Sequence, residues 1–178
     1  STILNGLEQS INCVSVNTLD AMGVSYSYNF AKNQFGLSGL TNHYVNSAGT
    51  VFTDEAYSPL GMGALTVGAT IRDVSAAYAT FANNGVYREA RTFTKVYDSE
   101  GNLILNNTQD SREVLSEKTI TYLNYCLSGV VSSGTGKEAR ISGHEVAGKT
   151  GTAQKGENIT NDGIFICFGP YKNPEVAI

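Results

Sequence analysis

Residues 143–152 read Gly-His-Glu-Val-Ala-Gly-Lys-Thr-Gly-Thr, and two different kinds of binding site share these letters. Residues 143–150 match the phosphate-binding pattern G-x-x-x-x-G-K-[ST]. That loop requires a buried strand before it and a helix after it, whose amino end faces the phosphates. Residues 139–145 contain no strand-like apolar run, and residues 150–158 show no helical periodicity. A nucleotide-binding P-loop therefore stays only as an alternative, which a nucleotide titration tests.

The same letters also fit a substrate-binding strand built on Lys149-Thr150-Gly151-Thr152. On an accessible edge strand, Lys149 supplies a positive charge, and the hydroxyls of Thr150 and Thr152 hydrogen-bond a carboxylate. Gly151 has no side chain, so a substrate backbone can approach closely. An extended peptide can then add to the sheet edge as a further strand. This interpretation predicts a peptide-carboxylate site with no metal ion and no cofactor.

Helical signals dominate the first three quarters of the chain. Short helices are predicted at residues 7–9, 13–22 and 26–34, with Ser25 as the cap of the third. Thr70 and Ser116 are predicted N-caps of two longer helices. Residues 37–63 are rich in Gly, Ser, Thr and Asn without periodicity, which predicts a long surface loop.

Strand signals gather toward the end of the chain. A hairpin is predicted around residues 98–101, and the later strands at residues 149–154, 164–168 and 176–178. The run 164–168 is apolar on both faces, as in a central strand covered by helices. Helices first and strands last indicate an α+β fold. Because the sequence ends inside the strand predicted at residues 176–178, we expect the domain to be incomplete in this chain.

The composition excludes several function classes. The 178 residues carry a net charge of −4 with no basic cluster, which argues against a nucleic-acid partner. No apolar run reaches the roughly 20 residues that span a bilayer, so membrane attachment is expected only outside this sequence. Cys13, Cys126 and Cys167 are far apart in sequence and form no C-x-x-C pair. We interpret them as small buried apolar residues rather than as disulfide or zinc ligands.

K-T-G occurs together with S-x-x-K and an S-D-N element in serine β-lactamases and penicillin-binding proteins. Ser-x-Asn alone is not specific here, since it occurs at residues 10–12, 15–17 and 27–29. Four longer stretches, in family order, resemble class A penicillin-binding proteins. They are residues 7–12, 65–87, 130–137 before K-T-G-T, and the strand pair 162–170 and 174–178 after it. The resemblance covers nearly the whole chain apart from about residues 37–58.

This resemblance implies a β-lactamase/transpeptidase-like fold, an antiparallel sheet flanked by helices, with residues 1–178 forming part of the domain. It implies a D,D-transpeptidase on the extracytoplasmic face of the bacterial membrane. There, a serine attacks the D-Ala-D-Ala end of a peptidoglycan stem peptide, and an amine resolves the acyl-enzyme into a cross-link. β-Lactams acylate the same serine.

The resemblance also assigns roles to residues of this chain. Ser10 would relay a proton toward the leaving amine, and Asn12 would hydrogen-bond the amide backbone of the substrate. Lys149 would tune Ser10, while Thr150 and Thr152 would bind the carboxylate beside Gly151. The backbone N–H of Thr152 would be one of two oxyanion donors.

One part of the family signature does not occur here, because no S-x-x-K lies within residues 1–178. In the family this motif precedes S-x-N, so we expect the nucleophile upstream of Ser1 and this chain alone to be inactive. Exposed sheet edges then favour self-association or pairing with the absent segment. A serine β-lactamase and a penicillin-sensing relative remain alternatives, since both share the motif logic.

Overall fold

The computed structural model describes residues 2–153 and 162–178. Its helices are α1 (Ile3–Glu8), α2 (Asn12–Met22), α3 (Val24–Asn33), α4 (Tyr57–Met62), α5 (Ile71–Ala82), α6 (Glu117–Ser132) and the 3-10 turn η1 (Lys137–Ala139). Its strands are β1 (Tyr44–Val45), β2 (Val51–Phe52), β3 (Val86–Arg88), β4 (Lys95–Tyr97), β5 (Leu103–Asn106), β6 (Ser111–Glu113), β7 (Ala147–Ala153), β8 (Asp162–Gly169) and β9 (Val176–Ala177). The predicted α+β class is confirmed.

The largest sheet of the described residues is antiparallel, with the order β7-β8-β9. Ala147 of β7 and Ala177 of β9 both lie opposite Phe168 of β8. Directly opposed residues point to the same face of a sheet. On that face, Ala147 and Phe168 form the core cluster together with Leu127 of α6.

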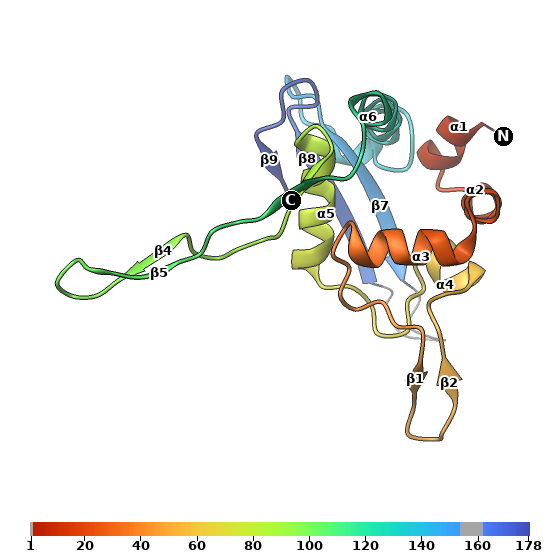
Figure 1. Cartoon of the computed structure of the whole chain (residues 1–178). Coiled ribbons are helices and arrows are strands. Elements are labelled where there is room, and N and C mark those ends of the chain that lie inside the picture. Colours follow the sequence, from red (N-terminus) through yellow and green to blue (C-terminus); the bar gives the residue numbers. More distant parts are fainter. Residues whose placement is uncertain (1, 154–161) are drawn as a thin grey trace.

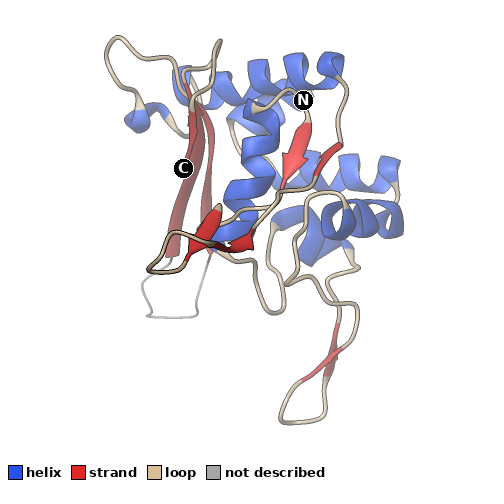
Figure 2. Ribbon diagram, turned by 60° about the vertical axis from the view of Figure 1, so that its left-hand side comes forward, coloured by secondary structure: helices blue, strands red, loops and turns tan. Residues whose placement is uncertain are grey.

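Helices α5 and α6 close this core over the sheet. Tyr78 and Phe81 from α5 and Leu123 from α6 pack against the cluster. Most of the helices lie to one side of the long strands (Figure 2). On β8, Ile166 and Phe168 are buried, while Phe165 and Cys167 are half-buried. The prediction that β8 is central is confirmed, but within the described residues only Ile166 and Phe168, on one of its faces, are fully buried.

The predicted caps of the long helices are confirmed. The hydroxyl of Thr70 accepts the amide of Asp73 at 3.0 Å, and the hydroxyl of Ser116 accepts the amide of Thr119 at 3.3 Å. The predicted cap at Ser25 is wrong, because α3 begins at Val24 directly after Gly23. Ser25 thus lies inside the helix, where its hydroxyl donates to the Glu55 carboxylate.

The segment 37–63 is more ordered than predicted. It contains the hairpin β1–β2, which projects from the body, and the helix α4 (Figure 1). The Asn46 side chain closes the hairpin turn by accepting the amides of Ala48 and Thr50. The interpretation of the three cysteines as buried is also wrong for Cys13, which is exposed, while Cys126 and Cys167 are half-buried.

Asp54 fixes the chain between this hairpin and α4. Its side chain is fully buried and accepts the amides of Thr41 at 3.0 Å and Thr66 at 2.7 Å. Burial by itself raises the pKa of Asp54, but hydrogen bonds from Thr41 and Thr66, together with the charge of Lys32, outweigh burial and hold the pKa below its ordinary value. Asp54 therefore joins two loop segments through an ionised carboxylate.

Replacing Asp54 with alanine is expected to destabilise the fold by about 1–3 kcal/mol, because two backbone amides lose their acceptor. The contribution of Asp54 is present at neutral pH and is lost as pH falls through its lowered pKa. Urea unfolding at pH 7 and at acidic pH measures both effects. The exposed Asp110→Ala variant is the control, and equal midpoints for the Asp54 variant and the wild type would contradict this role.

Candidate active site

Lys149 lies on β7, which is an edge strand of the sheet within the described residues. Its ammonium donates to the Ser10 hydroxyl at 2.7 Å and to the carbonyl of Thr150 at 2.9 Å. Ser10 and Lys149 are 139 positions apart in the sequence. The fold therefore brings together the two residues that the sequence analysis named as catalytic.

Ser10 lies in the short link between α1 and α2, and its hydroxyl contacts Lys149 of β7. Its φ is +53°, a left-handed conformation that non-glycine residues rarely adopt. Hydrogen bonds on both sides hold this conformation: the amide of Ser10 donates to Leu7, and the amide of Ile11 donates to Gly6. Such local strain persists only where the surrounding structure fixes it. The link thus presents the Ser10 hydroxyl in one direction.

The turn after α6 anchors this link. The amide of Thr135 donates to the carbonyl of Glu8 at 2.9 Å. A Cβ on Gly134 would collide with the same carbonyl oxygen and would also press on Val130. Gly134 is therefore required for the close approach of α1 to the end of α6.

Replacing Gly134 with alanine is expected to destabilise the protein by about 1–3 kcal/mol, because backbone atoms must move apart. The shift would displace Glu8 and hence Ser10, so it is also expected to slow the acylation of the full-length protein by benzylpenicillin that the resemblance implies. Thermal unfolding and the acylation rate measure the two effects. Gly163→Ala is the matched control, since no atom lies within 4 Å of the added carbon. Unchanged stability and rate for the Gly134 variant would refute the anchoring role.

Thr135 is a site residue that the sequence analysis missed. Its hydroxyl lies 2.7 Å from the hydroxyl of Thr150 on β7. The resembling stretch 130–137 contains Thr135, but no residue within that stretch was singled out. Because Thr135 also holds Glu8 through its amide, it connects the K-T-G strand to the link that carries Ser10.

Lys149 is partly removed from solvent. This desolvation lowers the pKa of its ammonium from the ordinary value. Burial disfavours the charged form of a lysine. While Lys149 is charged, its attraction for nearby negative or polar groups is stronger than it would be in water, because less solvent screens the charge. The site therefore carries one poorly solvated cation next to a serine hydroxyl.

The remaining predicted site residues lie along two elements. Asn12 is the exposed first residue of α2, two positions after Ser10. Gly151 and Thr152 continue β7 and lie opposite Ile164 and Gly163 of β8. A Cβ on Gly151 would approach the side chain of Ile164 to 2.7 Å. Asn12 and Thr152 are thus both exposed. Asn12 follows the link that carries Ser10, and Thr152 follows Lys149 along β7.

The P-loop alternative does not fit this geometry. Lys149 and Thr150 lie within a strand that continues to Ala153, not at the amino end of a helix. In the described part of the chain, no three His, Cys, Asp or Glu side chains form a group able to hold a metal ion. Over the same residues, no helix is both long and apolar enough to cross a bilayer.

An α+β domain with a Lys-Thr-Gly edge strand and a serine hydroxyl on its lysine matches two of the elements that mark serine β-lactamases and penicillin-binding proteins. The family described as the penicillin-binding protein transpeptidase domain matches residues 1–178. The chain belongs to this family. The relatives it matches indicate the class A type.

Three relatives illustrate the match. Penicillin-binding protein 1A of Clostridium acetobutylicum is 36% identical over 173 residues, which are 97% of this chain and 19% of that protein. Penicillin-binding protein 1A of Clostridium botulinum is 34% identical over 99% of this chain and 20% of its own length. Penicillin-binding protein 1A/1B of Bacillus subtilis is 35% identical over 85% of this chain and 15% of its own length. The chain thus spans about a fifth of the length of the curated relatives it matches.

Solved structures show the same fold. The D,D-transpeptidase domain of a peptidoglycan glycosyltransferase from Eggerthella lenta superposes with a TM-score of 0.77 at 24% identity, covering 99% of this chain and 47% of that one. Penicillin-binding protein A from Mycobacterium tuberculosis superposes with a TM-score of 0.75 at 21% identity, covering 99% and 44%. The predicted β-lactamase/transpeptidase-like fold is therefore confirmed, with this chain forming part of it.

Proposed function

We propose that residues 1–178 form the substrate-binding part of a peptidoglycan D,D-transpeptidase domain that works through a serine acyl-enzyme. The contact of Lys149 with Ser10 at 2.7 Å, next to an accessible K-T-G-T strand, carries this proposal. Enzyme activity at the level of the family is consistent with it, because the chain belongs to a transpeptidase family.

In this mechanism the residues of the chain divide the work. Lys149 holds the Ser10 hydroxyl as a hydrogen-bond acceptor, so Ser10 is free to donate its own proton toward the leaving amine. Asn12 hydrogen-bonds the amide backbone of the substrate. The hydroxyls of Thr150 and Thr152 bind the substrate carboxylate, and Thr135 orients the hydroxyl of Thr150. The amide of Thr152 is one of two oxyanion donors, each typically worth about 10²–10³ in rate.

The nucleophile belongs to another segment of the full-length protein. No S-x-x-K lies in residues 1–178, and the serine and lysine of that motif supply the attacking hydroxyl and its base. We therefore propose that the domain is completed by sequence beyond these residues. Residues 1–178 alone would bind substrate weakly and form no acyl-enzyme.

The substrates follow from the carboxylate site on an open strand edge. A stem peptide ending in D-Ala-D-Ala pairs with β7 by strand addition. β-Lactams occupy the same place, and a relative, penicillin-binding protein A from Mycobacterium tuberculosis, has been solved as an imipenem acyl-enzyme complex. Such a protein acts on the extracytoplasmic face of the bacterial membrane, with its anchor outside this chain and no nucleic-acid partner.

The test uses the full-length protein with a stem peptide ending in D-Ala-D-Ala and an acceptor amine. We expect a cross-linked product with release of D-Ala, and no product after treatment with benzylpenicillin. Rapid turnover of a chromogenic β-lactam without cross-linking would instead assign the protein to the β-lactamases. Slow acylation by β-lactams without any cross-linking would assign it to the penicillin sensors, and either result overturns the proposal.

A further inference from the structure

A long hairpin arm, residues 93–107, projects from the body on the side away from α1, α2 and α3 (Figure 1). Its strands β4 and β5 pair only with each other among the described residues. Every residue of both strands is exposed. Both long edges of the arm are therefore open to a further strand.

The arm is apolar on both of its faces. Leu103, Ile104 and Leu105 are 50%, 58% and 53% exposed, although successive residues of a strand point to opposite faces. Phe93 and Tyr97 on the other half of the arm are also exposed. A two-stranded hairpin is marginally stable by itself in water, and exposed apolar strand edges favour pairing with another chain. The arm therefore has the surface of a binding element.

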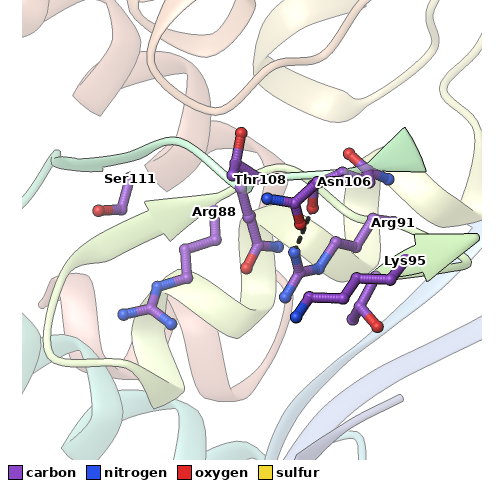
Figure 3. Close-up of a pocket in the computed structure, with 9 residues that line it drawn as sticks. Arg88, Arg91, Lys95, Asn106, Thr108 and Ser111 are labelled. Carbon is purple, nitrogen blue, oxygen red and sulfur yellow. Dashed lines mark hydrogen bonds between the residues drawn. The ribbon is translucent and has the colours of Figure 1, made fainter. Parts of the chain in front are cut away.

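The two ends of the arm carry opposite charges. At its root, Arg88, Arg91 and Lys95 line an open depression of about 440 Å³ whose lining contains no acidic residue. Figure 3 shows these three side chains extending to the same side of the ribbon. None of the three takes part in a salt bridge with another described residue. In a chain with a net charge of −4, this depression is a local concentration of positive charge.

At its tip, the arm is acidic. Asp98 accepts the amides of Glu100 and Asn102 and the side-chain amide of Asn102, which fixes the turn. Glu100 is left exposed at the end of the arm. Glu89 and Asp110 flank the root but do not line the depression. The tip thus presents an exposed carboxylate at the end of the arm that is remote from the basic depression.

We propose that the arm binds the same arm of a second copy of this chain, antiparallel, with each acidic tip in the basic depression of its partner. Two equal arms laid antiparallel over their full length place each tip at the other's root. The contact is then isologous, as in a two-fold symmetric dimer. The same overlap satisfies an open strand edge on each copy and places the exposed apolar side chains of the two arms next to one another, as cross-strand neighbours. This inference does not depend on the proposed catalytic function.

The charge of the binding partner distinguishes a second arm from an anionic surface. A membrane or polymer of phosphates would bind the root but would be repelled by Glu100 at the tip. A second antiparallel arm instead places its acidic tip at the basic root and its basic root at the acidic tip, so opposite charges meet at both ends. Self-association should therefore weaken when salt rises from about 0.1 M to about 1 M, because the charge pairs are exposed.

The test is analytical ultracentrifugation of the full-length protein with reversed charges at one end of the arm. One variant carries Arg88→Glu and Lys95→Glu at the root, and the other carries Glu100→Lys at the tip. Each alone is expected to self-associate at least about tenfold more weakly, since like charges then face each other. Mixed together, the two variants should form a heterodimer with restored affinity, because both contacts become complementary.

This rescue separates the proposal from simple misfolding of the arm. Lys118→Glu, an exposed change at the start of α6, is the control and should associate like the wild type. A wild-type protein that stays monomeric up to about 1 mM would overturn the proposal. So would reversed variants that associate normally, or a mixture that shows no gain over either variant alone.

Discussion

Replacing Lys149 with alanine is expected to slow acylation of the full-length protein by benzylpenicillin about 10²–10⁴-fold, the range that a positioned proton-transfer system contributes. The ammonium of Lys149 is a hydrogen-bond partner of the Ser10 hydroxyl at 2.7 Å. Without it, Ser10 loses both its orientation and the nearby charge. Stopped-flow or mass-spectrometric acylation rates measure the effect, with the folded state verified by circular dichroism.

The control for this change is Lys172→Ala, which removes another lysine of the chain. Lys172 is exposed, and its one hydrogen bond to another described residue is to Glu145 at 3.2 Å, so its loss should leave the acylation rate unchanged. Lys149→Arg keeps the charge but changes the geometry, because guanidinium and ammonium donate differently. It should retain more activity than the alanine variant. A wild-type rate for Lys149→Ala would remove Lys149 from the mechanism.

The pH dependence of acylation follows from the same residue. Burial lowers the pKa of Lys149 from its ordinary value, so its charge is lost at a lower pH than that of a solvated lysine. The acylation rate should be maintained at pH values below this lowered pKa, where Lys149 is charged, and should fall as pH rises through it. The Lys149→Arg variant stays charged and should lack this alkaline decline. Between the lowered and the ordinary pKa the unfolded state binds more protons, so stability itself rises with pH there.

Replacing Phe168 with alanine is expected to destabilise the fold by about 3–5 kcal/mol. Phe168 is 1% exposed and lies in the cluster where α5, α6 and the sheet meet. Its removal leaves a cavity that the helices can close only in part. Urea or thermal unfolding of the full-length protein measures the loss.

Ile164→Ala on the same strand is the control for Phe168. Ile164 is 47% exposed, so it loses less buried surface and should cost about 1 kcal/mol or less. If both substitutions changed the unfolding midpoint equally, the core would not lie where the cluster places it.

The sequence predicted the elements whose signals are local and strong. Thr70 and Ser116 cap their helices as expected, and the K-T-G strand lies on a sheet edge. The resemblance assigned Ser10 and Lys149 to one site, and the structure brings their side chains into contact. Both predictions depend on residue types and motifs that can be recognised in a single sequence.

Other features depend on contacts that no local pattern reveals. The strands of the β1–β2 hairpin are two residues long, too short for periodicity, and the Asn46 side chain closes their turn. Thr135 became a site residue only through its contacts with Thr150 and Glu8, which lie far from it in the sequence. Likewise, Asp54 is buried because it meets two distant amides. Tertiary hydrogen bonds, rather than propensity, decide these positions.

The proposed transpeptidase function is tested most directly by the intact mass after benzylpenicillin treatment of residues 1–178 and of the full-length protein. We expect one covalent adduct on the full-length protein, on the serine of an S-x-x-K segment, and none on residues 1–178. No adduct on a folded full-length protein would contradict the transpeptidase proposal. An adduct on residues 1–178 alone would contradict the placement of the nucleophile outside this chain.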